Sequence, residues 1–454
     1  MIHRNNFIFR TFCITFWAVT CSPFILEEWL TPLAGFRSML LLLFDAAILV
    51  LGLMTLRDRR QIILVATFFL LAFTSTILMN DIGWLNLFNG SRQFIGMLFA
   101  PSILIFLLNC RDKDRYRASL DRQMYIFLWI QAFCVTWQFI KYGANDHGGG
   151  SMGNGCSGII STLIILISYY FTTRDFDPSD FKKSLWRNRK YILLIYPVAL
   201  NETKVSMIFL LVYAVLLFHF QGRSMVKLIC SLPIICILGL GFQFAYDAAL
   251  GGKGYDMGDS AEMGEYLFGK DIEDEIGNIQ NLIDNDMMGG EIEGEIAIQD
   301  LPRFIKISMT PIAVNTSRGG MVFGAGLGHF KGGTIVSKTE FYNQYEWLIT
   351  GTVNMYMFLF MQLGILGFVW FGFYLVILLD FRKKSIAYAT QLKLFLLVVA
   401  LISIFYNESF SILGFCLVFT FLGVSSTLSD AHTEKAGLPD PTAQDQESES
   451  LQPR

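Results

Sequence analysis

Charged residues are scarce in this chain, and that scarcity excludes most soluble architectures. They make up 16% of the 454 residues, whereas a soluble domain usually carries about 25%. Hydrophobic residues make up 53% and come in long, nearly uninterrupted blocks. Since a membrane-spanning helix needs about 20 consecutive apolar residues, the composition predicts an all-α polytopic membrane protein.

The lack of a basic excess, of a disulfide pattern and of an internal repeat makes three further classes of protein less favoured. The net charge of −3 leaves no basic excess for a nucleic-acid partner. The eight cysteines fall almost entirely within apolar blocks and the large hydrophilic loop has none, so they indicate small core residues rather than a disulfide framework. No internal repeat is visible, which weakens a transporter built from inverted repeats.

The apolar blocks give the predicted membrane spans. The first run, 7–26, lacks a small-x-small cleavage site and contains Arg10, so it indicates a membrane helix rather than a signal peptide. Spans are expected near 6–26, 38–56, 61–79, 94–110, 124–141, 158–173, 228–246, 352–380, 391–406 and 409–425.

Basic residues in the short loops predict the orientation. Clusters at 57–60, 111–122, 182–190 and 382–384 are expected in the cytoplasm. The intervening segments LEEWLTPLAGF, NDIGWLNLFNG and NDHGGGSMGNG carry almost no base and are expected to face outward.

The block 191–218 fits this alternation only as a hairpin. As one helix it would rise about 42 Å, too long for a hydrocarbon core of about 30 Å. A turn at 201–204 restores the alternation and gives about twelve membrane segments with both termini in the cytoplasm. Because the legs are short, the turn is expected below the outer surface, against protein or a water-filled cavity.

Four regions follow from this topology. Residues 1–246 form membrane segments one to nine, and 247–349 form one large extracytoplasmic loop between segments nine and ten. Residues 350–426 form the last three segments, and 427–454 form a disordered cytoplasmic tail. The large loop is acidic and glycine-rich up to Asp300 and basic from Leu301 onward.

The basic half of the loop holds the first candidate residues. Its start, 301–313, has apolar residues near helical spacing and predicts an amphipathic helix at the membrane surface that carries Arg303 and Lys306. The following run, GGMVFGAGLGHFKGG, allows backbone N–H groups to approach an anionic ligand closely, as phosphate-cradling loops do. Alternatively, Lys306, Lys331 and Lys338 are a simple electrostatic anchor to anionic lipid headgroups.

Two residues of this loop are candidate general bases. His329 is the lone histidine of the basic half, and a histidine is expected to act as a base near neutral pH or to donate to a phosphate oxygen. Glu346, next to Trp347, is the second candidate, although a Tyr-Glu-Trp sequence is also typical of a membrane interface. No second His, Cys or paired carboxylate stands at ligand spacing, so neither a metal nor another cofactor is expected.

Glu202 and Lys204 stand at the tip of the predicted hairpin. A charge at the membrane centre costs about 2.5–3.5 kcal/mol on insertion scales, so intramembrane ions are functional candidates by default. The alternative is a self-neutralising pair in a buried turn.

Taken in order, three motifs over 197–371 make the chain resemble the O-antigen polymerase and O-antigen ligase superfamily of bacterial envelope glycan assembly. LNETKVS resembles the family's T-x-S-R turn, with Lys204 in place of the arginine. Arg303 followed by FGAGLGHF resembles the family's periplasmic arginine and G-x-G-x-x-x-F run. NMYMFLFMQLGILGFVWF, beginning at Asn354, resembles the family's N-x-Y-L helix.

The resemblance implies a GT-C-like, metal-independent glycosyltransferase of the bacterial inner membrane. Its substrate would be an undecaprenyl-pyrophosphate-linked glycan, and its partners would be membrane lipids and a chain-length regulator. Residues implied for the pyrophosphate are Arg303, Lys204 and Arg318, with Gly324, Gly326 and Gly328 closing over it. Glu202 would orient Lys204, and His329 would be the base.

Three alternatives to a polymerase remain open at this stage. A ligase acting on lipid A core or protein would share the site, but ligases carry a histidine just ahead of the helix asparagine, where this chain has Thr352 and Val353. A transporter would spread charges over several helices. A structural envelope protein would tolerate alanine at Arg303 and Lys204.

Overall fold

The computed structural model describes residues 2–143, 148–174, 176, 180–201, 204–219, 303–329, 339–349, 353–381 and 387–428. Within these ranges every regular element is helical. The elements up to the hairpin are α1 (Ile2–Phe24), η1 (Ile25–Trp29), η2 (Thr31–Phe36), α2 (Arg37–Thr55), α3 (Arg59–Phe73), η3 (Thr74–Met79), α4 (Trp84–Ser91), η4 (Arg92–Phe94), α5 (Ile95–Asn109), α6 (Lys113–Tyr142), η5 (Gly150–Met152), α7 (Ser157–Arg174), α8 (Phe181–Arg187), α9 (Arg189–Leu193), α10 (Tyr196–Leu200) and α11 (Lys204–His219). The later elements are α15 (Arg303–Asn315), α16 (Gly320–Phe323), α17 (Glu340–Gln344), α18 (Glu346–Ile349), α19 (Met355–Leu379), α20 (Ala387–Tyr406), η8 (Ser409–Ser411) and α21 (Leu413–Leu428).

The prediction of a helical membrane protein is confirmed. By length and composition, 7 helices in the described ranges can cross a membrane: His3–Trp29, Arg37–Thr55, Arg59–Met79, Trp84–Asn109, Lys113–Tyr142, Met355–Leu379 and Ala389–Tyr406. Two shorter apolar helices, Val205–Leu217 and Leu413–Thr427, also match predicted blocks. The predicted span 228–246, the acidic half of the loop and the tail 429–454 lie outside the described residues. The total of about twelve membrane segments therefore stays a prediction.

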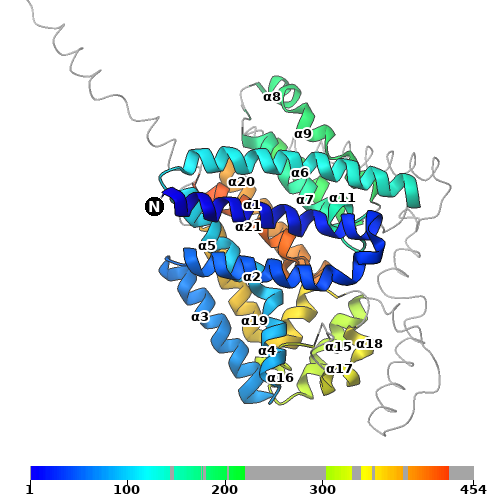
Figure 1. Ribbon diagram of the computed structural model, residues 1–454. Coiled ribbons are helices and arrows are strands. Elements are labelled where there is room, and N and C mark those ends of the chain that lie inside the picture. Colours follow the sequence, from blue (N-terminus) through cyan, green and yellow to red (C-terminus); the bar gives the residue numbers. More distant parts are fainter. Residues whose placement is uncertain are drawn as a thin grey trace, which may run out of the picture.

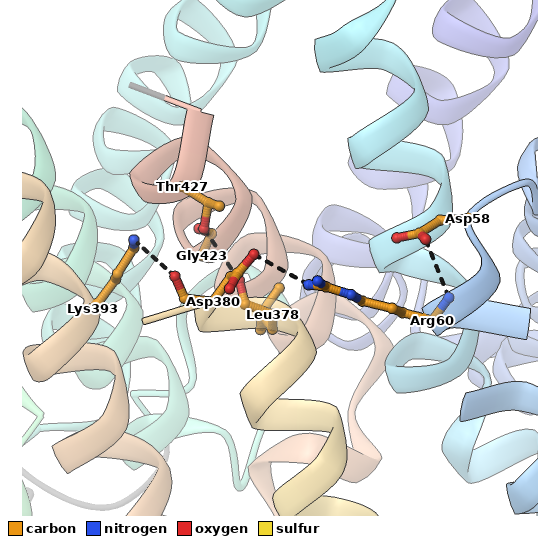
Figure 2. Close-up of polar contacts among 7 residues, drawn as sticks. All are labelled: Asp58, Arg60, Leu378, Asp380, Lys393, Gly423 and Thr427. Carbon is orange, nitrogen blue, oxygen red and sulfur yellow. Dashed lines mark hydrogen bonds and ion pairs between the residues drawn. The ribbon is translucent and has the colours of Figure 1, made fainter. Parts of the chain in front are cut away.

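The predicted cytoplasmic cluster 57–60 lies at the end of the bundle where α3 begins and α5 and α19 end, which we call the basic end. The cluster 382–384 lies outside the described residues. At the basic end the Arg60 guanidinium at the start of α3 pairs with the Asp380 carboxylate at the end of α19, with 3.3 Å between Nη1 and Oδ2 (Figure 2). Lys393 of α20 donates to the Asp380 carbonyl at 3.4 Å, and Asp58 caps α3 by accepting from the Arg60 backbone N–H (Figure 2). The opposite end, where α1 ends and α19 begins, we call the loop end.

Helix α7 is the centre of the fold. It is buried along nearly its whole length and packs against α6, α9, α10, α11, α20 and α21. Figure 1 shows it behind α1 and α6, in the same half of the molecule as α11, α20 and α21. A helix surrounded on all sides needs apolar residues on every face, which explains why its sequence resembles a membrane span.

The predicted hairpin is present and folds around α7. On the incoming leg the Asn188 amide donates to the carbonyl of Thr172 near the end of α7. At the turn the Asn201 amide donates to Ser161 Oγ in the first part of α7, at 3.1 Å. On the outgoing leg the Tyr213 hydroxyl donates to Thr172 Oγ1 at 2.9 Å. The two legs therefore run in opposite directions along α7, as the hairpin prediction requires, whereas the predicted place of the hairpin in a membrane stays a prediction.

Two segments expected to be outward-facing loops are instead a helix and a buried loop in the structure. NDIGWLNLFNG contributes most of α4, which continues through η4 into α5, because its Trp, Leu and Phe extend the apolar block. NDHGGGSMGNG enters the protein: 148–153 is buried. Gln138 accepts from the Gly150 N–H at 2.8 Å and Gln131 accepts from the Ser151 N–H at 2.9 Å. These buried glutamines accept hydrogen bonds from backbone N–H groups that would otherwise need water as a partner.

Candidate functional site

Helix α15 confirms the predicted helix, but its lysine does not face outward. Lys306 is fully buried, whereas Phe304 is 58% and Ile312 53% exposed. Burial, and secondarily the nearby Arg303 guanidinium, lower the pKa of Lys306. The interpretation of Lys306 as a headgroup anchor is therefore wrong. Its helix packs on α19, α16 and α18 and so buries the lysine against protein (Figure 1).

Arg303, the first residue of α15, lies against the end of α20. Its guanidinium carbon is 4.5 Å from the centre of the Tyr406 ring, and both residues are half-buried. An arginine over an aromatic face is held by the ring quadrupole while its N–H groups remain available at the guanidinium edge. Arg303 is thus held at the loop end, with donors available to an anion.

Asn354 lies at the same place. Its Oδ1 accepts from the Met357 N–H at 2.9 Å and so caps α19. The next residue, Met355, donates its backbone N–H to the Asn407 carbonyl at 3.1 Å, directly after Tyr406. Asn354 is 1% exposed, and among the described residues its Nδ2 has no hydrogen-bond partner. A buried amide donor without a partner costs about 1–3 kcal/mol, so this group is poised for an acceptor.

The hairpin turn reaches this cluster through the first turn of α7. Gly158 is in contact with the Tyr406 ring: a Cβ there would lie 3.2 Å from Cε1. One helical turn on, Ser161 accepts from Asn201. Glu202 lies outside the described residues, and Lys204 is the first residue of α11. We call Arg303, Asn354, Tyr406 and Asn407 the Tyr406 cluster.

The glycine loop, 324–328, lies elsewhere and is buried. It is threaded between α19 and η3. The Ala325 N–H donates to the Met361 carbonyl at 2.6 Å, and the Leu327 N–H donates to Thr76 Oγ1 at 3.0 Å. The Gly324 carbonyl accepts from the Asn80 amide at 3.0 Å. These N–H groups are already satisfied by protein, so the loop is a packing element rather than an open anion cradle.

The same packing explains why the loop needs glycine. Gly324, Gly326 and Gly328 have φ of 74°, 98° and 105°, where side chains are strained. Gly324 also faces Gly364, where α19 kinks with φ 64°: a Cβ on Gly324 would lie 2.7 Å from the Gly364 nitrogen. The sequence pattern that resembles a phosphate loop therefore allows close approach of two backbones.

His329 closes the glycine loop and is fully buried. Nδ1 is 2.6 Å from Thr339 Oγ1 and Nε2 is 2.8 Å from the Ala325 carbonyl oxygen. Its ring packs on Phe341, with 4.8 Å between centroids. Burial lowers its pKa from 6.5 to about 4. Both nitrogens are engaged and the ring is enclosed, so the expected role as a base gains no support.

Two further candidates stand apart from the Tyr406 cluster. Arg318 is exposed and follows the far end of α15, so it lies roughly 20 Å of helical rise from Arg303. Glu346 is exposed and accepts from the Tyr342 hydroxyl at 3.2 Å, as expected of an interfacial residue. The candidate residues thus fall into two groups rather than one site.

Tyr406, Asn407 and Gly158 were not singled out from the sequence. The pattern that could have found the first two is FYNES, a short polar break between the last two apolar blocks. Like LNETKVS it places Asn and Glu together at the same predicted side of the membrane. Glu408, half-buried, adds a carboxylate there.

The chain matches no model of a protein family and no curated protein. Within the described ranges, no three His, Cys, Asp or Glu side chains come together so as to hold a metal ion. What the site offers chemically is therefore one cation on an aromatic ring, buried amide groups and a nearby carboxylate.

Proposed function

We propose that this protein is a polymerase of undecaprenyl-pyrophosphate-linked oligosaccharide repeat units, acting without a metal at the outer face of the bacterial inner membrane. In this assignment the loop end faces outward and the basic end faces the cytoplasm, in keeping with the positive-inside rule. The products would be O-antigen, capsule or exopolysaccharide, with a chain-length regulator as partner.

The observation that carries the proposal is the convergence at Tyr406. Four segments far apart in sequence meet there: the start of α15, the start of α19, the end of α20 and, through α7, the hairpin turn. They bring Arg303 and the unpaired Nδ2 of Asn354 to one end of a membrane bundle, where Lys204 begins α11. A lipid-linked pyrophosphate supplies the acceptor oxygens that such donors need.

The reaction assigns a task to each group. A hydroxyl oxygen of the incoming repeat unit attacks the anomeric carbon of the growing chain, and the bond from that carbon to pyrophosphate breaks. Undecaprenyl pyrophosphate leaves with the bonding electrons, and Arg303 and Lys204 stabilise its developing charge. We assign the hydroxyl proton to a carboxylate, with Glu408 as the candidate. Glu202 keeps its proposed role of orienting Lys204.

Arg318, the glycine loop and His329 are not part of the proposed site. Arg318 is separated from Arg303 by the length of α15, and the glycine loop and His329 are engaged by protein groups. We assign the glycine loop and His329 to the fold and give the exposed Arg318 no role in the site.

A strain lacking the protein, complemented with variants, tests the proposal. Without the protein, single repeat units should accumulate on the lipid carrier. Arg303→Ala should lower polymer formation by about 100-fold or more at an unchanged protein level, whereas the matched Arg318→Ala should restore wild-type polymer. If long glycan persists on its carrier, the protein is a ligase. If Arg303→Ala polymerises normally, the proposed site is wrong.

A further inference from the structure

Tyr406 contacts two parts of the loop end at once. The Arg303 guanidinium lies over its face, with the guanidinium carbon 4.5 Å from the ring centroid. Its Cε1 edge abuts Gly158 in the first turn of α7, where an added Cβ would come within 3.2 Å. The ring therefore fills the space between α7, which bears the hairpin turn, and α15, which bears the arginine.

A free arginine side chain samples many rotamers, and fixing one of them costs entropy. A guanidinium also binds a diphosphate well in one plane, because its N–H groups form a rigid fork. An aromatic face attracts the guanidinium and leaves the edge N–H groups free. The contact with Tyr406 can thus fix the plane of the fork before the substrate arrives.

We propose that Tyr406 is the positioning residue of Arg303, and that position 158 is glycine so that the ring can take this place. This inference rests on the proposed function, because it assumes that Arg303 acts on a lipid-linked pyrophosphate. It adds that Tyr406 acts through its ring and not through its hydroxyl.

The test uses the purified full-length protein in phospholipid nanodiscs. The substrate is the lipid-linked single repeat unit isolated from the strain lacking the protein. Tyr406→Phe keeps the ring and should keep kcat/KM within about twofold. Tyr406→Leu removes the ring and should lower kcat/KM about tenfold, chiefly through kcat, since orientation matters most in the transition state. Gly158→Ala displaces the ring and should give an intermediate loss.

A matched control removes a similar contact elsewhere. Lys141 lies over the ring of Tyr142 at the end of α6, 4.7 Å from its centroid, so Tyr142→Leu should leave kcat/KM unchanged. The decisive comparison is the double variant: on an Arg303→Ala background, Tyr406→Leu should have no further effect, because the group that it positions is gone. A merely structural tyrosine would lower activity on both backgrounds.

The outcomes separate the two proposals. If Arg303→Ala is fully active, the proposed function fails at its site. If Arg303→Ala is impaired while Tyr406→Leu is normal, or Phe fails to rescue, the positioning role is wrong and the proposed function stands. Equal apparent Tm values for Tyr406→Leu and the wild type show that the loss is not unfolding.

Discussion

The Tyr406 cluster and the glycine loop lie in the same protein but differ in how their polar groups are satisfied. In the glycine loop, backbone N–H groups donate to Thr76 and Met361, and both nitrogens of His329 are engaged. In the Tyr406 cluster, Arg303 is half-buried on a ring and Asn354 keeps an unpaired donor. The segment that looks more like a ligand loop has backbone donors engaged by protein, although side-chain acceptors of Asn86 and Gln362 beside it have no partner among the described residues. The polar break at Tyr406 instead keeps an unpaired donor next to a cation.

The difference shows that a sequence motif indicates a binding site only where some of its hydrogen-bonding groups remain unpaired in the folded protein. Glycine-rich sequence permits close approach of backbone, and protein backbone can occupy that space as well as a phosphate can. Buried polar groups in proteins are nearly always paired, and Asn354 is one of several exceptions among the described residues. What distinguishes Asn354 is that its unpaired donor belongs to the same cluster as the Arg303 cation. The comparison predicts that substitutions in the loop change stability and substitutions in the cluster change activity.

The largest effect on stability is expected at the kink of α19. Gly364→Ala would place a Cβ against the carbonyl groups of Met321 and Val322, at a φ of 64°. Strain and overpacking together should cost about 3 kcal/mol and lower the apparent Tm by roughly 3 °C. Thermal unfolding of the purified protein followed by far-UV circular dichroism measures this.

Gly372→Ala is the matched control in the same helix. Nothing lies within 4 Å of its Cβ position, and alanine is the better helix former by up to about 1 kcal/mol, so its Tm should stay or rise. If Gly364→Ala were as stable as Gly372→Ala, the close packing of the glycine loop on α19 would be wrong.

Sequence reasoning predicted the membrane helices because apolar block length is a local property. It predicted the hairpin because loop charge and the thickness of a bilayer constrain the whole chain, and Asn188, Asn201 and Tyr213 now trace it along α7. Both arguments need no knowledge of which helices are neighbours.

The site could not be predicted in the same way, because its environment is set by remote sequence. Leu327 and Thr76 bond across 251 positions, and nothing near FGAGLGHF indicates that partner. Lys306 looks exposed in its own sequence, and only packing of α15 on α19 buries it. Tyr406 was missed because FYNES carries no motif and its importance comes from Arg303 and Gly158.

A second effect is expected at His329, and it develops only as the pH falls below neutral. Its folded-state pKa of about 4 lies below the ordinary 6.5, so the unfolded chain takes up the proton first as pH falls. Its contribution is therefore complete above about pH 6.5 and is lost progressively toward pH 4, on the order of 3 kcal/mol in all. His329→Gln should abolish this part of the slope of Tm between pH 7 and pH 5.

Activity of the same variant tests the comparison directly. Loss of a general base costs 10²–10⁴-fold, whereas loss of a packing residue costs folded protein. Polymer formation by His329→Gln at pH 7, normalised to folded protein, should be within about threefold of the wild type. A loss above a hundredfold with an unchanged Tm would make His329 part of the site and remove the distinction between the two regions.

The smallest effect is expected at the basic end, where the ion pair is exposed. Arg60 is 55% exposed in its pair with Asp380, and exposed pairs contribute about 0–1 kcal/mol. Arg60→Ala should therefore shift the apparent Tm by no more than about 2 °C, and high salt should remove the difference because it screens the pair in the wild type. In the proposed orientation Arg57 and Arg59 still keep the loop in the cytoplasm, so cysteine labelling from outside should find the same topology for this variant. A Tm loss as large as that of Gly364→Ala would instead mean that the Arg60–Asp380 pair is essential for the stability of α19. Charge at the basic end would then contribute as much to stability as packing does in the glycine loop.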